Sequence, residues 1–536
     1  MRMRCVVVLL VFLAMSASAQ LSSFPKPSYF RETFAHLNPK VELKDPTRLK
    51  DFVQSGKLEL SLKAYLELVM ANNTDIQVQM LSVETPKNAI MRALSTWDPT
   101  SSSSFNSTRS KSPAVTALDG ANTSQSLTQT ANFSVGQVLP TGGQYSVGFT
   151  AGKNSTNSSY ALLNPNLNSG LTLNVSQPLL RNRGYYVNHL NLMVARSRYR
   201  QADYTLRSNL LQLTENAENA YWDVVQAREN LHVAESARAL ADATLQLSKR
   251  ELELGALSPL DIYNPEQQLA TANLGVSQAR FSLAQTENAL RKQMGADLDP
   301  AIRELPIVLT ETVELPVATE VDPEKEIEIA MRARPDLKAA MQNLDLDDLS
   351  LQSARNELLP NLSINGAYSS RGIGGVINPY TDRIPGGLGD ALSQMFGFGY
   401  PSYSFGLNLQ FPIRSHAAAA DMADAMVQKK RDALTVRNTQ QQIRLSILNA
   451  VNNLESSKKS LELAKAASEF ATKYLDAENQ KYTLGIDQMQ FVLQAQNTLT
   501  QAQSSVVQAQ VGLRRNLLLL YTQTGELLEQ RGIVVQ

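Results

Sequence analysis

The chain has 536 residues, its 50 Lys and Arg are balanced by 50 Asp and Glu, and 43% of its residues are hydrophobic. Without a basic excess or a basic cluster it has no electrostatic footprint for nucleic acid, which excludes nucleic acid as a partner. The one cysteine, Cys5, has no second cysteine to pair with, so stability must come from packing or assembly.

The first residues have the three parts of a secretory signal peptide. Arg2 and Arg4 precede an apolar run, Val6 to Met15, and Ala17-Ser18-Ala19 completes the segment. We therefore expect residues 1–19 to be removed from the mature protein.

The next segments differ in composition. Residues 20–58 combine several prolines with mixed charges, which predicts an irregular arm. From Leu60 a helical pattern of apolar residues continues to about Ser95. Residues 98–180 are then rich in Ser, Thr, Asn and Gly and carry few charges.

Strands are predicted within residues 98–180, because apolar and polar residues alternate there. A turn at Pro140–Gly143 separates two of these strands. The same alternation occurs in soluble sandwiches, so it does not by itself place the strands in a membrane. The alternating apolar positions are Phe133, Val135, Tyr145, Val147, Phe149, Leu171, Leu173 and Val175.

A heptad seam from Leu206 to Leu252 predicts a long helix, from about Tyr186 to Leu254, that packs along a partner. Gly255 ends it, and a second helix is expected from about Leu260 to Met294.

The same plan recurs in the second half, where Gly485 stands in the position of Gly255. Several matches in one register predict an internal duplication. Each long helix has about 70 residues and each shorter one about 35, or roughly 100 and 50 Å at 1.5 Å per residue. The helices then form rods with strands at one end and the glycine tips at the other. The predicted segments are repeat 1 (59–299), a linker (300–320), repeat 2 (321–522, with strands about 360–413) and a C-terminal tail (523–536).

With this order and duplication, residues 58–522 resemble the TolC family of outer-membrane efflux proteins. The residues that carry the resemblance are Leu60–Asp75 and its copy Val321–Asp336, Gln177-Pro178-Leu179, Phe411-Pro412-Ile413, and the tips after Gly255 and Gly485. The resemblance implies a mixed α and β membrane protein. Its homotrimer would form an outer-membrane β-barrel that continues as a long α-helical barrel.

The resemblance also implies a location and partners. The protein would lie in the cell outer membrane, in contact with its lipid, with the helical part and residues 20–58 in the periplasm. It would dock on a periplasmic adaptor (membrane fusion) protein and an inner-membrane transporter. As a passive exit duct for small molecules it would be no enzyme and need no cofactor or metal. Two alternatives stay open: a channel for type I protein secretion, and a secreted structural coiled-coil protein.

Two residues at the tips are expected to hold the periplasmic end closed. They are Asp261, six residues after Gly255, and Tyr482, three residues before Gly485. Asp261 also fits helix capping, within a segment that begins at Ser258.

At three positions this sequence departs from the family. Asp487 stands where the family has an arginine, so the salt bridge of the closed state is not expected. Phe491 and Gln494 replace an acidic ring, so a cation-selective constriction is not expected there.

The number of strands per protomer stays open between four and six, because the turn at Pro140–Gly143 either adds a hairpin or forms a loop at the barrel rim. On the helix before the second strand region, Asp345, Asp347 and Asp348 are predicted to form a solvated face.

Overall fold

A computed structural model describes residues 53–54, 57–113, 122–158, 160–255, 257–296, 300, 303–311, 321–377 and 387–533. The predicted signal peptide and nearly all of the N-terminal arm lie outside the described residues. Residues Pro46–Gln536 form one compact unit, to which all the structure below belongs. In the described part of the chain, no helix combines the length and apolar character needed to cross a membrane.

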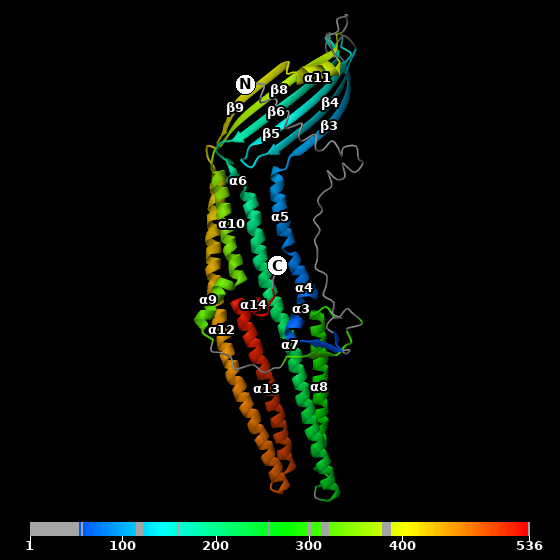
Figure 1. The fold of residues 1–536 in the computed structure, drawn as a ribbon, viewed down its shortest axis with the longest axis vertical. Coiled ribbons are helices and arrows are strands. Elements are labelled where there is room, and N and C mark those ends of the chain that lie inside the picture. The colour runs from blue at the N-terminus through cyan, green and yellow to red at the C-terminus, as the bar shows by residue number, and fades with distance from the viewer. Residues whose placement is uncertain are drawn as a thin grey trace. The chain divides into compact units, whose positions relative to one another are not determined.

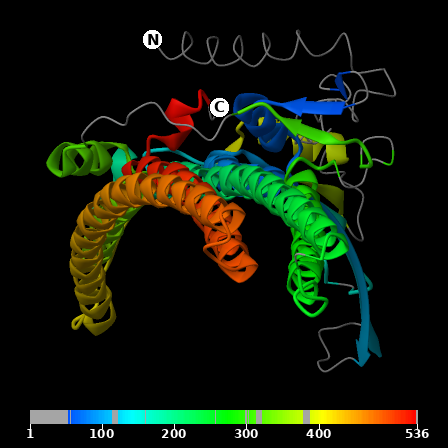
Figure 2. The same ribbon diagram turned by 90° about the horizontal axis from the view of Figure 1, so that it is seen from below.

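Two long helices organise this unit: α7 (Leu190–Glu253, 64 residues) and α12 (His416–Thr483, 68 residues). Each turns back into a shorter antiparallel helix, α7 into α8 (Tyr263–Gln293) and α12 into α13 (Met489–Thr524) (Figure 1). Seen from below, the helices lie side by side along an arc (Figure 2). Residues of the predicted seam, such as Ala217, Val224 and Leu245, are buried along α7, as heptad packing requires.

The helices that precede the strands are broken, whereas the sequence pattern of residues 60–95 predicted one continuous helix. The first break has a polar cause: the Asn73 side chain accepts hydrogen bonds from the backbone N–H groups of Asp75 (2.9 Å) and Ile76 (3.2 Å) and so begins a new helix. The remaining helices are α3 (Leu62–Asn72), α4 (Thr74–Leu81), α5 (Glu84–Leu94), the 3-10 turn η2 (Ser95–Trp97), α6 (Tyr185–Asn188), α9 (Pro323–Ala333), α10 (Pro335–Glu357), α11 (Leu388–Phe396) and α14 (Leu527–Gln530).

A three-stranded sheet lies beside the middle of α7, where the sequence predicted an irregular arm and a linker. It contains β1 (Val53–Gln54), β2 (Lys57–Leu60) and β7 (Ile307–Leu309), with β2 and β7 parallel. The prediction failed because these strands are too short for a sequence period. Alternate residues of β2 and β7 are buried in a core where the Tyr65 hydroxyl donates to the Ala217 carbonyl at 3.1 Å.

The second sheet has six strands in the order β3-β4-β5-β6-β8-β9, every neighbouring pair antiparallel. The described chain therefore supplies six strands. The turn at residues 139–143 joins β4 to β5 at the helix end of the sheet, where the Gly184 N–H donates to the Thr141 carbonyl at 3.1 Å. The turn thus adds a hairpin to the sheet, and the alternative of four strands with a loop at the barrel rim is wrong. The strands are β3 (Thr100–Pro113), β4 (Thr123–Val138), β5 (Gln144–Thr156), β6 (Leu163–Pro178), β8 (Asn361–Ile377) and β9 (Tyr400–Gln410).

The two faces of this sheet differ in polarity. On the polar face, Ser, Thr and Asn side chains bond across strands; Ser102 and Ser134 lie 2.8 Å apart, Oγ to Oγ. On the apolar face, Phe133, Phe149 and Leu171 lie in one cross-strand row. Phe133 is still 48% exposed, so within this chain the apolar face lies largely uncovered.

Candidate functional site at the helix tips

Both long helices end in the same backbone turn. Gly255 and Gly485 have φ angles of +72° and +69°, in the left-handed region that side chains with a Cβ rarely adopt. The Gly255 N–H donates to the Leu252 carbonyl (3.0 Å) and the Gly485 N–H to the Tyr482 carbonyl (2.9 Å). A Cβ at either glycine would meet no atom within 4 Å, so backbone conformation alone explains these glycines.

Tyr482 links the two tips. Its hydroxyl, on the last turn of α12, donates to the Glu251 carboxylate on the last turn of α7. Burial, followed by this bond and the charge of Glu251, raises the pKa of Tyr482 above its ordinary value. The hydroxyl therefore stays protonated and remains a donor throughout the physiological pH range.

Asp487 lies beside a lysine. Lys481 Nζ is 3.5 Å from the Asp487 carboxylate and 2.7 Å from Glu478 Oε1. The hydrogen bond to Glu478 is the largest cause of a raised pKa of Lys481, and the charge of Asp487 adds to it. Asp487 is thus held by a cation of its own hairpin.

Two amide contacts and an apolar cluster also join the hairpins. Gln496 Nε2 donates to Thr244 Oγ1 at 2.7 Å, and Gln268 Nε2 donates to Asn497 Oδ1 at 2.6 Å. A small apolar cluster packs around Met489, at the start of α13. These contacts join the α7–α8 hairpin to the α12–α13 hairpin.

The other predicted site residues lie outside the contact between Tyr482 and Glu251. α8 begins at Tyr263, so Asp261 lies in the turn before the helix, where its N–H donates to the Ser258 carbonyl at 3.0 Å. Phe491 and Gln494 lie on the exposed side of the first turns of α13. Within this chain the Tyr482 hydroxyl bonds Glu251 rather than Asp261, and the expectation that Asp261 and Tyr482 hold the periplasmic end closed stays a prediction.

Sequence reasoning missed Glu251, although a signal was present. Glu251 lies four residues before Gly255, and Tyr482 lies three residues before Gly485. Because both hairpins turn in the same way at these glycines, the two side chains lie at the same height on neighbouring hairpins. The resemblance directed attention to the residues that follow Gly255, on the other side of the turn.

The turns also expose large apolar side chains. Leu254 is 84% exposed, Leu484 73% and Ile486 69%, and they form the ends of both hairpins. Apolar side chains at such a position favour a partner protein, since exposure to water is unfavourable.

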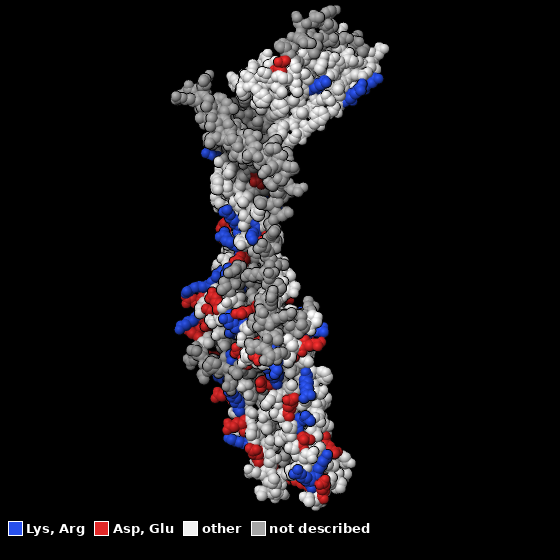
Figure 3. Space-filling view, turned by 45° about the vertical axis from the view of Figure 1, so that its right-hand side comes forward, with Lys and Arg blue, Asp and Glu red and all other residues white. Residues whose placement is uncertain are grey.

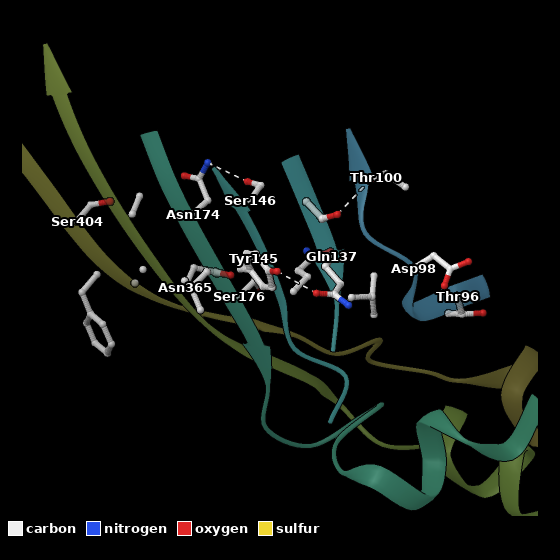
Figure 4. A pocket seen from close by; sticks show the side chains of 18 of the residues that line it. Thr96, Asp98, Thr100, Gln137, Tyr145, Ser146, Asn174, Ser176, Asn365 and Ser404 are labelled. Atoms are coloured by element: carbon white, nitrogen blue, oxygen red, sulfur yellow. Dashed lines mark hydrogen bonds between the residues drawn. The ribbon is translucent and has the colours of Figure 1, made fainter. Parts of the chain in front are cut away.

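A hollow of about 680 Å³ lies at the other end of the long helices, beside the ends of the sheet strands (Figure 4). Its polar side chains bond one another: Tyr145 donates to Gln137 at 2.9 Å and Asn174 to Ser146 at 3.3 Å. Asp98 is the one acidic residue that lines it. In the described part of the chain, no group of His, Cys, Asp or Glu residues is placed to hold a metal ion.

Comparison with known proteins gives the family. The pattern that defines the family "Outer membrane efflux protein" matches residues 144–296 and 327–526, well over half of the chain. The chain belongs to the outer membrane efflux protein family. This confirms the resemblance seen in the sequence, and it places the protein in the outer membrane with its helical part in the periplasm.

Individual members of the efflux protein family are distant from this chain. It is 25% identical to the outer membrane protein TolC of Vibrio cholerae over 269 residues, 50% of this chain and 56% of TolC. It is 21% identical to a probable efflux pump outer membrane protein, TtgC of Pseudomonas putida, over 58% of this chain and 59% of TtgC. The chain thus spans little more than half of these relatives.

The fold is shared along a greater length. The Campylobacter jejuni CmeC outer membrane channel matches with a TM-score of 0.62 and 16% identity, over 91% of this chain and 90% of CmeC. The efflux family consists of outer-membrane channel proteins rather than enzymes.

Proposed function

We propose that this protein is the outer-membrane channel of a tripartite efflux system. It would be a passive exit duct for small molecules, which an inner-membrane pump delivers through a periplasmic adaptor. The observation that carries the proposal is the six-stranded sheet, polar on one face and apolar and exposed on the other.

The edges of the sheet support a closed assembly. β3 and β9 are the edge strands, and all residues of both are exposed within the chain. Unpaired backbone groups cannot remain in lipid, so each edge requires another strand. In a homotrimer, β9 of one copy would pair with β3 of the next, and three copies would close a barrel of eighteen strands. The polar face would then line the duct.

The helices would continue this barrel. We propose two internal repeats, residues 59–299 and 321–522, each built of short helices, strands, a long helix and a returning helix. Three copies of the arc of helices would close into a helical barrel. The tips form the proposed gate, in which the bond from Tyr482 to Glu251 keeps the two hairpins together and Lys481 holds Asp487 within its own hairpin.

The exposed apolar tips support an adaptor as the partner. Replacing Leu254 and Leu484 by Asp would remove the apolar ends without altering the two glycine turns. We expect this double variant to reach the outer membrane as a trimer, yet to lose efflux. The matched control replaces both leucines by Met, which keeps the apolar surface.

The assay is drug accumulation in a strain that lacks the native gene, complemented with each variant. Wild type and the Met control should restore efflux, and the Asp variant should not. A wild-type protein that restores protein secretion but leaves drug accumulation unchanged would contradict the efflux role. Recovery of the wild-type protein as a soluble periplasmic monomer would contradict the channel itself.

A further inference from the structure

Charged residues are unevenly distributed over the molecule. Lys, Arg, Asp and Glu cover the helical part, whereas the sheet shows few of them (Figure 3). In the described strands of the six-stranded sheet, every charged residue is basic: Arg109, Lys111, Lys153 and Arg371. Such a one-sided distribution favours an anionic partner.

Three of the four basic residues share the apolar face. Alternate residues of a strand point to the same side, so Arg109 and Lys111 lie on the side of Phe105, and Lys153 on the side of Phe149. Arg371 lies on the polar face, next in sequence to Ser370, which points to the apolar one. Arg371 can therefore serve as a control for the three basic residues, because it lies on the other face of the same sheet.

Their position along the strands matches a membrane boundary. Arg109 and Lys153 each lie four residues beyond a phenylalanine, about 13 Å along the strand at 3.3 Å per residue. With a tilt of about 40° this is roughly 10 Å along the membrane normal, so the basic residues would lie near the edge of a ~25 Å apolar band centred near these phenylalanines. The end concerned is the one away from the helices, which lie in the periplasm.

The three basic side chains are available. All are exposed, and none forms an ion pair with a described residue. The register pairs Arg109 with Leu127, and Gln129 with Lys153, which places the Cα atoms of Arg109 and Lys153 about 12 Å apart across β4. Side chains of this length can reach one phosphorylated head group together.

Helix α11 adds an apolar surface to the same face of the sheet. The hydroxyl of Ser169 donates to the Ala391 carbonyl at 2.8 Å, and that of Ser370 to the Met395 carbonyl at 2.7 Å. α11 thus packs on the middle of β6 and β8, around Ser169 and Ser370, and leaves Phe396 60% exposed. Basic groups beside exposed apolar side chains fit an amphiphile with phosphates and acyl chains.

We propose that Arg109, Lys111 and Lys153 bind the phosphates of the phosphorylated glycolipid that forms the outer leaflet of the outer membrane. Its acyl chains would lie against the apolar face beside α11. The inference rests on the proposed passage of this sheet through the membrane, and it adds a specific lipid to that proposal.

The test uses the full purified protein and three probes: diphosphorylated, monophosphorylated and dephosphorylated lipid A. Wild-type affinity should fall with each phosphate removed. A triple variant, Arg109→Gln, Lys111→Gln and Lys153→Gln, should bind the diphosphorylated probe on the order of 100-fold more weakly, since each basic residue near a lipid surface contributes about a fivefold effect. The control Arg371→Gln should bind as wild type does.

Two results would overturn the inference: equal affinity for all three probes, or equal loss in the triple variant and the control. Tighter binding of phosphatidylglycerol than of diphosphorylated lipid A would overturn the glycolipid assignment. Trimer formation and efflux are measured on the same variants. If the triple variant keeps trimer formation, efflux and wild-type lipid binding, the proposed lipid site is refuted and the proposed channel is not. If the wild-type protein forms no trimer, the proposed channel itself is refuted.

Discussion

Removal of one hydroxyl tests whether the tips hold the proposed channel closed. Tyr482→Phe deletes the donor to Glu251 and keeps the ring in place. A hydrogen bond to a charged group contributes about 1.5–3 kcal/mol, and the lower value applies because Tyr482 is only half-buried. About 1.4 kcal/mol is tenfold in an equilibrium constant, so one such bond should shift the ratio of open to closed tips roughly tenfold.

Conductance in planar bilayers measures this shift. We expect Tyr482→Phe and Glu251→Gln each to raise conductance, and the double variant to add little to either, because both remove the same bond. Tyr474→Phe is the matched control: it lies two turns earlier on α12, 40% exposed and without a described hydrogen bond.

The expectation from the family gives the opposing result. If Asp261 were the partner of Tyr482, then Asp261→Asn would raise conductance and Glu251→Gln would not. That outcome, or unchanged conductance in Tyr482→Phe, would refute the reasoning from this structure. A rise of the same size in Tyr474→Phe would show that the effect is not specific to the bond.

Two other predictions concern buried carboxylates away from the tips. Glu218 is 1% exposed and accepts two hydrogen bonds from Arg531, at 2.8 and 2.6 Å. Arg531→Met would leave this buried carboxylate unpaired, so it should lower the free energy of unfolding by about 3–5 kcal/mol in thermal unfolding. Glu218→Gln should lower it less, because the Arg531 side chain can turn to water. Burial, then the charge of Asp432, raises the pKa of Asp347 from 3.8 to about 6. Between about pH 4 and pH 6 the folded state therefore holds a proton on Asp347 that the unfolded state has lost. The free energy of unfolding should fall as pH rises through this range. Asp347→Asn should therefore raise the melting temperature by about 2–4 °C at pH 7.5 and not at pH 4; an equal effect at both pH values would contradict this.

The long helices could be predicted from the sequence because their packing requires a period. A seam near 3.5 residues repeated over many turns has few structural alternatives, and α7 ends within one residue of the expected Leu254. β3 carries no such signal. Its one large apolar residue is Phe105, and the rest is mainly Ser, so neither face has a period to detect.

The contacts of individual side chains were less predictable than the elements. Asp347 was expected on a solvated face together with Asp345 and Asp348, yet it is 7% exposed. Its burial depends on the approach of α12 to α10, which no local pattern encodes. The partner of Tyr482 was missed for the same reason, since Glu251 is 231 positions away in sequence.

The polarity of β3 makes physical sense at the edge of an unclosed sheet. An exposed edge strand with apolar side chains invites pairing with any other strand, and polar or charged residues reduce that risk. β9, at the opposite edge, has four large apolar side chains on the apolar face: Tyr403, Phe405, Leu407 and Leu409. In the proposed trimer each junction would join one edge of each kind. Each chain then presents an apolar edge, β9, and a Ser-rich edge, β3, and correct closure pairs β9 of one copy with β3 of the next. If two β9 edges paired instead, a Ser-rich β3 edge would remain unpaired in lipid.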